Sequence, residues 1–152
     1  MDVKVLIGAP TSVRHDYVID DYFENIKKFT YDNFDIILVD TSYPADDKYH
    51  QKLQANSDFV SSLAWNPKSE HPLQMLARAR EKIRQFFVKH DYDYMFFLDT
   101  DVLPPENSIE RLISFDKDCV GFVVHCYGAV SYTHLRDHET RHDLVCRLLL
   151  EK

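Results

Sequence analysis

No apolar run in this 152-residue chain approaches the roughly 20 residues that a helix needs to cross a bilayer. Residues 1–8 also lack the basic start and the long apolar stretch that mark a secretory signal peptide. The three cysteines, Cys119, Cys126 and Cys146, form no CxxC pair and no even disulfide framework. These absences predict a cytoplasmic protein without a transmembrane segment, whose thiols are reduced and structural.

The chain also lacks an excess of basic residues, because its formal net charge is −7. This charge argues against nucleic acid as a partner, since a phosphate backbone attracts basic surfaces. The apolar share of 45% and the charged share of 28% are those of an ordinary globular protein, and the length suits one domain. An acidic protein that handles phosphates needs local arginines or a metal ion to do so.

Short apolar runs alternate with segments of helical spacing along the chain. This alternation predicts an α/β fold with a mostly parallel sheet and flanking helices. The run at residues 94–98 is fully apolar, as expected of a parallel strand buried on both faces. Strands are predicted at residues 3–8, 34–39, 58–65, 94–98 and 119–124, helices at 16–29, 72–90 and near 109–113, a loop at 9–11 and irregular chain at 41–56.

Polar residues follow three of the predicted strands, at the edge where open parallel sheets bind their ligands. Thr11 follows the first strand and Asp40 the second, while Asp99 and Asp101 follow the apolar strand at residues 94–98. Because the carboxyl ends of parallel strands share one edge, we expect these side chains to converge. Asp40 taken alone fits a turn former or helix cap as well as it fits a ligand.

The sequence Asp99-Thr-Asp101 is the stronger signal for a site. Two carboxylates at the end of a hydrophobic strand are costly unless a cation compensates them. A divalent ion does so, and it can also bridge a diphosphate that the carboxylates would otherwise repel. Oxygen ligands favour a hard ion, so we predict Mn²⁺ or Mg²⁺ at this turn. The alternative is an acidic surface turn without a ligand.

Arg80 is the second signal, because helical spacing places it within an apolar face of the helix at residues 72–90. The apolar residues of that face are Leu73, Leu76, Ile83 and Phe87. An arginine in such a stripe needs an anion or a set of carbonyl groups. We predict a contact with the bases or phosphates of a ligand, or with the Asp99–Asp101 turn. The alternative is a buried ion pair with a core carboxylate.

The segment from Ala77-Arg-Ala-Arg80 to Asp91-Tyr-Asp-Tyr-Met-Phe-Phe-Leu-Asp-Thr-Asp-Val-Leu-Pro-Pro105 resembles the DxD region of GT-A glycosyltransferases, most of all the family 2-like group. The resemblance spans about residues 3–129. It implies a Rossmann-like half-fold that binds a nucleotide-sugar donor, a UDP- or GDP-sugar, for a hexosyltransferase reaction. Glu81 departs from the pattern, since an asparagine often follows the arginine in this group.

The resemblance also implies roles for individual residues. Asp101 matches the residue that coordinates Mn²⁺ or Mg²⁺ on the donor diphosphate, and Asp99 the one that contacts ribose or a metal-bound water. Pro10, Thr11 and Asp40 match positions that hold the nucleoside, often uridine, and Arg80 matches a donor-contacting arginine. In this family the acceptor site and catalytic base lie downstream, so we expect residues 1–129 to be a partial domain that is inactive alone. The sugar, the acceptor and the stereochemistry stay open.

Two other functions compete with this interpretation. A phosphatase of the haloacid-dehalogenase kind also carries a DxD after a strand, although the motif there ends the first strand and continues toward Gly-Thr. Release of phosphate from p-nitrophenyl phosphate would favour that function. The second alternative is a catalytically inactive remnant that binds nucleotide and transfers nothing.

Residues 130–152 are predicted to be a non-native tail. They contain His138-Glu-Thr-Arg-His142, formally the HExxH motif of zinc proteases, and a histidine or cysteine every four residues from His134 to Cys146. The run SYTHLR followed by HET, which begins at Ser131, resembles a tail on unrelated translated metagenomic fragments that looks like read-through into adapter DNA. We therefore exclude it from fold and function, against the alternatives of a solvated amphipathic helix or a real zinc site.

Deleting residues 131–152 is expected to leave nucleotide and Mn²⁺ binding unchanged. A zincin needs a third protein ligand on a supporting scaffold, and ten residues follow His142. Calorimetry on the full and shortened chains measures this. A stoichiometric zinc site that is lost in His138→Ala or His142→Ala would contradict the prediction.

Overall fold

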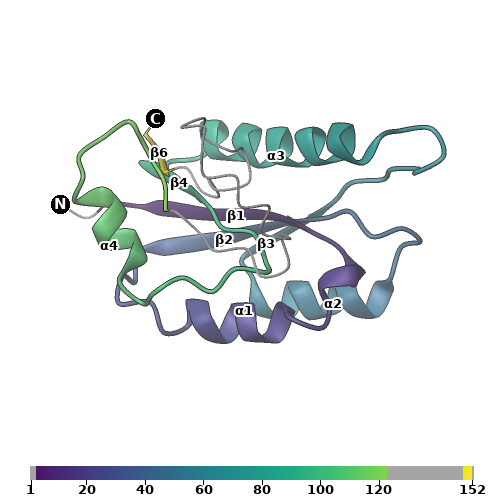
Figure 1. Cartoon of the computed structure of the whole chain (residues 1–152), viewed down its shortest axis with the longest axis horizontal. Helices are drawn as coiled ribbons and strands as arrows, with labels where there is room; N and C mark the ends of the chain where they lie inside the picture. The colour runs from purple at the N-terminus through teal and green to yellow at the C-terminus, as the bar shows by residue number, and fades with distance from the viewer. Residues whose placement is uncertain (1–2, 123–148, 152) are drawn as a thin grey trace, which may run out of the picture.

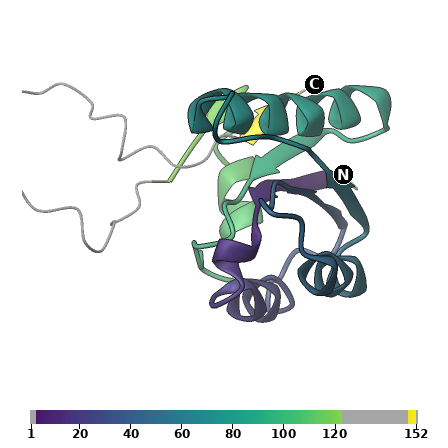
Figure 2. The same ribbon diagram turned by 90° about the vertical axis from the view of Figure 1, so that its right-hand side faces the viewer.

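The computed structural model describes residues 3–122 and 149–151, which form one six-stranded sheet with helices on both faces (Figures 1 and 2). The strand order is β3-β2-β1-β4-β6-β5, and the first four strands of that order run parallel. The predicted α/β class with a mostly parallel sheet is confirmed. The strands are β1 (Val5–Thr11), β2 (Phe34–Asp40), β3 (Phe59–Ser62), β4 (Tyr94–Phe97), β5 (Cys119–Val120) and β6 (Leu149–Glu151). The helices are α1 (Ile19–Ile26), α2 (Asp47–Asn56), α3 (Pro72–Lys89), α4 (Ser108–Ile113) and the 3-10 helix η1 (Val13–His15).

The sheet separates two hydrophobic cores, because successive side chains of a strand point to opposite faces. Val5, Ile7 and Ala9 of β1 belong to the core shared with α1, α2 and α4. Leu6 belongs to the second core, which α3 covers. Figure 2 shows α3 on one side of the sheet with α1 and α2 on the other. All seven residues of β1 are therefore buried, as expected of a central parallel strand.

Gly8 lets α3 lie close against β1. A Cβ atom at residue 8 would come within 2.5 Å of the Cγ2 methyl of Ile83 on α3. Ile83 is itself fully buried and β-branched, so its methyl group has little freedom to move away. The small residue in β1 thus sets the distance between the sheet and the helix that carries Arg80.

The first strand continues through Thr11, so the predicted loop at residues 9–11 is wrong. Proline is rare inside sheets because it lacks an N–H donor. At Pro10 the ladder toward β4 has already ended with the Leu98 N–H donating to the Gly8 carbonyl at 3.1 Å. The Leu98 carbonyl accepts instead from the Tyr22 hydroxyl at 3.2 Å. Pro10 is therefore tolerated because a side chain satisfies the neighbouring acceptor.

Helix α2 lies within the segment that the sequence analysis reads as irregular, so that prediction is also wrong. Asp46 caps the helix by accepting a hydrogen bond from the Tyr49 backbone N–H at 2.7 Å. Tyr49 and Leu53, four residues apart, are the buried residues of the helix. A capping aspartate and one pair of apolar residues are a weak local signal. Most of the stability of this helix comes from packing against the sheet.

One helix, one strand and the buried face of another helix also differ from the prediction. The helix predicted at residues 16–29 is the shorter α1, because residues 16–18 form a turn before it and residues 27–28 form a turn after it. Of the strand predicted as buried at residues 119–124, the described residues 119–122 contain the two-residue β5, and Cys119 there is exposed. On α3 the buried residues are Ala79, Ile83 and Phe87, whereas Leu73 is 68% exposed. The apolar face of this helix is therefore narrower than predicted.

Strand β6 comes from the predicted tail and pairs antiparallel with both β4 and β5. The HExxH sequence and the rest of residues 130–148 lie outside the described residues, so the non-native origin of the tail stays a prediction. No helix in the described part of the chain is long and apolar enough to cross a membrane.

Gly8→Ala is expected to destabilise the fold by roughly 1–3 kcal/mol, because the added methyl group overpacks the contact between β1 and α3. Urea unfolding measures the change. Ile83→Ala removes the opposing methyl group and should itself cost roughly 2–5 kcal/mol. The double variant should be more stable than the sum of the two single changes predicts, because each relieves the other. Additive effects would show that residues 8 and 83 do not compete for the same space.

Candidate functional site

The predicted convergence of polar residues at the carboxyl edge of the sheet is confirmed. Thr11 is the register partner of Asp40, which is in turn the partner of Ser62 on β3. On the other side of β1, the turn after β4 brings Thr100 within 3.4 Å of Thr11, measured between the hydroxyl oxygens. The ends of β1 and β2 and the turn after β4 therefore meet around Thr11.

A chain of hydrogen bonds runs through the buried hydroxyl of Thr11. Its Oγ1 lies 2.6 Å from the Tyr49 hydroxyl, and Thr100 Oγ1 lies 2.9 Å from Nδ1 of His15. Thr100 is fully buried, although it is the middle residue of the DxD sequence. The turn is thus anchored through its centre, which leaves Asp99 and Asp101 at the surface. Burial also raises the pKa of Tyr49 to about 12, so the Tyr49 hydroxyl stays protonated over the physiological range.

Asp40 holds together the loops that follow β1 and β2. Its Oδ1 accepts hydrogen bonds from the Ser42 backbone N–H at 3.0 Å and from the Ser42 hydroxyl at 2.6 Å. Its Oδ2 lies 3.0 Å from Nδ1 of His50. The Ser42 hydroxyl in turn accepts from the backbone N–H of Val13 at 2.8 Å. In this structure the carboxylate acts as the turn former that the sequence allowed, and its contact with a nucleoside stays a prediction.

Arg80 reaches the DxD turn from α3. Its Nη2 lies 3.6 Å from Oδ1 of Asp99, and the two side chains are 46% and 29% exposed. The expectation that Arg80 sits inside a buried apolar face is wrong, because the buried stripe runs through Ala79 and Ile83 and leaves Arg80 beside it. The contact with the Asp99–Asp101 turn is one of the two predicted for this arginine. A half-exposed pair of this kind contributes little to stability.

Asp101 is exposed at the same turn, and its carboxylate forms no ion pair with another residue in the range 3–122. The described residues hold no group of three or more histidine, cysteine, aspartate or glutamate side chains suited to a metal ion. The turn offers carboxylate oxygens from Asp99 and Asp101, and the binding of Mn²⁺ or Mg²⁺ there stays a prediction.

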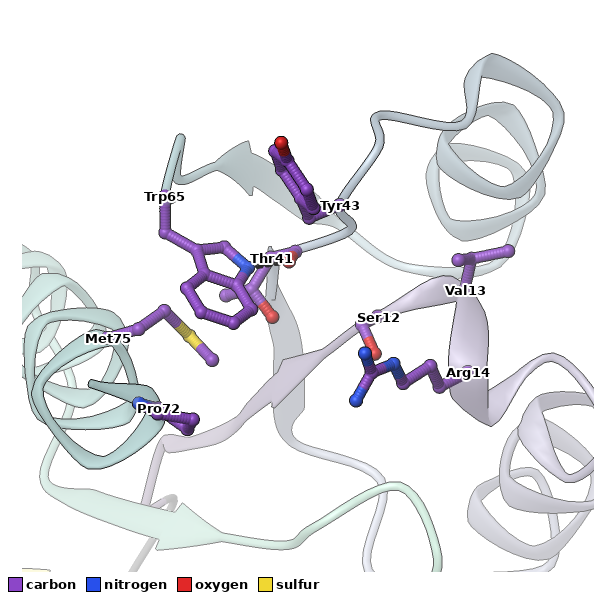
Figure 3. Close-up of a pocket in the computed structure, with 8 residues that line it drawn as sticks. All are labelled: Ser12, Val13, Arg14, Thr41, Tyr43, Trp65, Pro72 and Met75. Carbon is purple, nitrogen blue, oxygen red and sulfur yellow. Dashed lines mark hydrogen bonds between the residues drawn. The ribbon is translucent and has the colours of Figure 1, made fainter. Parts of the chain in front are cut away.

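A cavity of about 110 Å³ lies at the ends of β1 and β2, among the loops that follow them and the first turn of α3 (Figure 3). The Trp65 indole N–H donates to the Thr41 carbonyl at 2.7 Å, which joins the loop after β3 to the loop after β2. The Tyr43 ring lies 6.1 Å from the Trp65 ring, between centroids. The cavity is lined by Ser12, Val13, Arg14, Thr41, Tyr43, Trp65, Pro72 and Met75.

None of the cavity residues is predicted by the sequence analysis. They come from the loops after three strands and from the first turn of α3, so no spacing in the sequence connects them. The chain has a single tryptophan, Trp65, but the strand predicted at residues 58–65 includes it, whereas in the structure it lies in the loop after β3. Pro10 and Thr11, which were predicted to hold a nucleoside, lie one or two residues before the cavity wall.

Comparison with solved structures shows which proteins share this fold. S. aureus TarS 1–349 matches with a TM-score of 0.58 at 17% identity, over 81% of this chain and 36% of that chain. TarS 1–349 in complex with UDP matches with a TM-score of 0.59 at 16% identity, over 83% of this chain and 37% of that one. The glycosyltransferase GlyE of Streptococcus pneumoniae TIGR4 matches with a TM-score of 0.56 at 13% identity, over 98% of this chain and 34% of that one.

The TM-scores show that the chain shares its fold with TarS and with the glycosyltransferase GlyE, and at these identities the likeness concerns the backbone alone. The chain spans about a third of the length of these solved proteins. No protein-family model matches the chain, and no curated protein matches it by sequence.

Tyr49→Phe is expected to lower the free energy of unfolding by about 1 kcal/mol, because it removes a hydrogen bond from the buried Thr11 hydroxyl. It should also flatten the loss of stability at alkaline pH. The unfolded chain releases the Tyr49 proton near pH 10 and the folded chain near pH 12, so the wild type loses stability as the pH rises through this interval. Thermal unfolding measured from pH 8 to pH 12 tests both effects.

Tyr17→Phe is the matched control, because the Tyr17 ring is 80% exposed and outside the hydrogen-bond chain. It should retain the wild-type profile. If Tyr49→Phe loses stability as steeply as the wild type above pH 10, the Tyr49 hydroxyl is not protected in the way described.

Proposed function

We propose that this chain is the donor-binding part of a metal-dependent GT-A glycosyltransferase, one that transfers a hexose from a nucleotide diphosphate sugar. The observation that carries the proposal is the position of the DxD turn and the aromatic cavity on either side of one strand end. Thr11 bonds to the middle of the turn, and Ser12, the next residue, lines the cavity. A ligand that fills both places has a flat apolar group at one end and an anion at the other.

The cavity suits a nucleobase. Trp65 lines the cavity, and its N–H is already bonded to the backbone, so we propose that the ring stacks on the base. Stacking of a base on an aromatic side chain contributes roughly 1–3 kcal/mol. Tyr43 lies on the same side of the cavity as an additional aromatic surface. The UDP that accompanies TarS in one of the matching structures supports a uridine nucleotide as the first ligand to test, before a GDP-sugar.

The DxD turn suits the diphosphate through Mn²⁺ or Mg²⁺. Asp101 is proposed as the metal ligand, with Asp99 as a second ligand or as a contact to ribose or a metal-bound water. Such an ion takes one or two carboxylates and completes its coordination with phosphate oxygens and water. When bound, it supplies the positive charge that offsets repulsion between the carboxylates and the diphosphate.

The remaining predicted residues have supporting roles around the cavity and the DxD turn. Arg80 holds Asp99 in the free chain and contacts the donor when it is bound. Pro10 and Thr11 form the end of β1 between the cavity and the turn. Asp40 holds the loop that contains Ser42. The acceptor site and the catalytic base are proposed to lie outside residues 1–129, so this segment binds the donor and does not transfer it.

Asp101→Asn is expected to weaken UDP binding at saturating Mn²⁺ by tenfold or more, on the order of the loss for a hydrogen-bonded charged group. Calorimetry with UDP in Mn²⁺ and in EDTA measures it, and the wild type in EDTA should resemble the variant in Mn²⁺. Asp91→Asn is the control, because Asp91 is an exposed aspartate before β4 and makes the same change in charge.

Two results would contradict the proposal. Equal affinity of the wild type for UDP in Mn²⁺ and in EDTA would remove the metal from donor binding. A similar loss in Asp91→Asn and Asp101→Asn would show a general effect of charge rather than a site at the turn.

A further inference from the structure

Arg14 is the charged residue among those that line the cavity. It is exposed, and its guanidinium forms no ion pair with a carboxylate in the range 3–122. Figure 3 shows its side chain extending from η1 so that the guanidinium lies beside Ser12, on the side of the other lining residues. Arg80, the other arginine of the site, already lies 3.6 Å from Asp99.

The two neighbours of Arg14 fix its position. The backbone N–H of Val13 donates to the Ser42 hydroxyl at 2.8 Å, and Ser42 is itself held by Asp40. On the other side, Nδ1 of His15 lies 2.9 Å from the Thr100 hydroxyl in the DxD turn. The short helix η1 is thus tied to the cavity loop at one end and to the DxD turn at the other. Arg14 lies between these two hydrogen-bonded residues.

We propose that Arg14 binds the diphosphate of the nucleotide, between the base in the cavity and the metal at the DxD turn. This inference rests on the proposed function. A base in the cavity and a diphosphate at the turn require the phosphates to pass η1, which is where the guanidinium lies. Guanidinium is a pure hydrogen-bond donor, and its planar fork matches phosphate oxygens.

The charges of the site agree with this assignment. A divalent ion cancels the two carboxylates of Asp99 and Asp101, which leaves the arginines to balance the diphosphate. Arg80 supplies one positive charge and Arg14 the second, and a nucleotide-sugar diphosphate carries two negative charges. In a chain with a net charge of −7, a local cation of this kind is needed to hold an anion.

Arg14→Met tests the assignment with uridine, UMP and UDP as probes in Mn²⁺. Trp65 is the single tryptophan and lines the cavity, so its fluorescence reports occupancy by the base in each titration. Loss of a charge-assisted contact should weaken UMP and UDP about tenfold and leave uridine unchanged. Arg14→Lys keeps the charge without the planar fork and should recover part of the loss.

Arg84→Met is the matched control, because it removes the same charge from a guanidinium that already pairs with Glu81 at 2.7 Å. It should bind all three probes as the wild type does. Circular dichroism and thermal unfolding of every variant confirm that the fold is retained.

Each outcome decides the proposal. Unchanged UDP affinity in Arg14→Met overturns the role of Arg14 and leaves the proposed function standing if the wild type binds UDP. An equal loss for uridine and UDP overturns it too, because Arg14 would then contact the base or support the cavity wall. If the wild type binds neither uridine nor UDP, both this inference and the proposed function fail.

Discussion

The buried hydroxyl of Thr11 is the interaction on which the site depends. Strand β1 lies between two parallel neighbours, so its last side chain is almost fully buried and must find its hydrogen-bond partners inside the protein. It finds them in Tyr49 of α2 and Thr100 of the DxD turn. One buried group therefore joins the central strand, a helix on one face of the sheet and the turn that carries the exposed carboxylates.

In the same arrangement, the residues that anchor the loops of the site differ from those that are exposed to a ligand. Thr100 and Asp40 are buried and make their hydrogen bonds within the chain, whereas Asp101 and Arg14 are exposed beside them. Rigid anchors keep charged groups in place without neutralising them, and such preorganisation lowers the cost of ordering them when an anion binds. Under the proposed function, a nucleotide would meet the carboxylates of Asp99 and Asp101, two arginines and the aromatic wall of the cavity.

The likeness to TarS and GlyE concerns the backbone, and the argument for function rests on the residues of the site. A parallel sheet with helices on both faces serves many chemistries, so the fold alone does not select one. What favours a nucleotide ligand here is the combination of Trp65, Arg14 and the DxD turn around one strand end. The shared fold describes the arrangement of the backbone, and the local chemistry is what bears on the ligand.

The sequence by itself determined the α/β class, the apolar strand at residues 94–98 and the carboxylates that follow it, because periodicity and strand ends are local properties. It also predicted that Thr11, Asp40 and the DxD turn would meet, since parallel strands share their carboxyl edge. Only the tertiary structure decided that Pro10 belongs to β1, where Tyr22 satisfies the acceptor that proline leaves. It likewise decided that Arg80 lies beside the buried face of α3, and that Trp65 and Arg14 line one cavity. These features depend on contacts between loops that are distant in the sequence, and no local pattern carries that information.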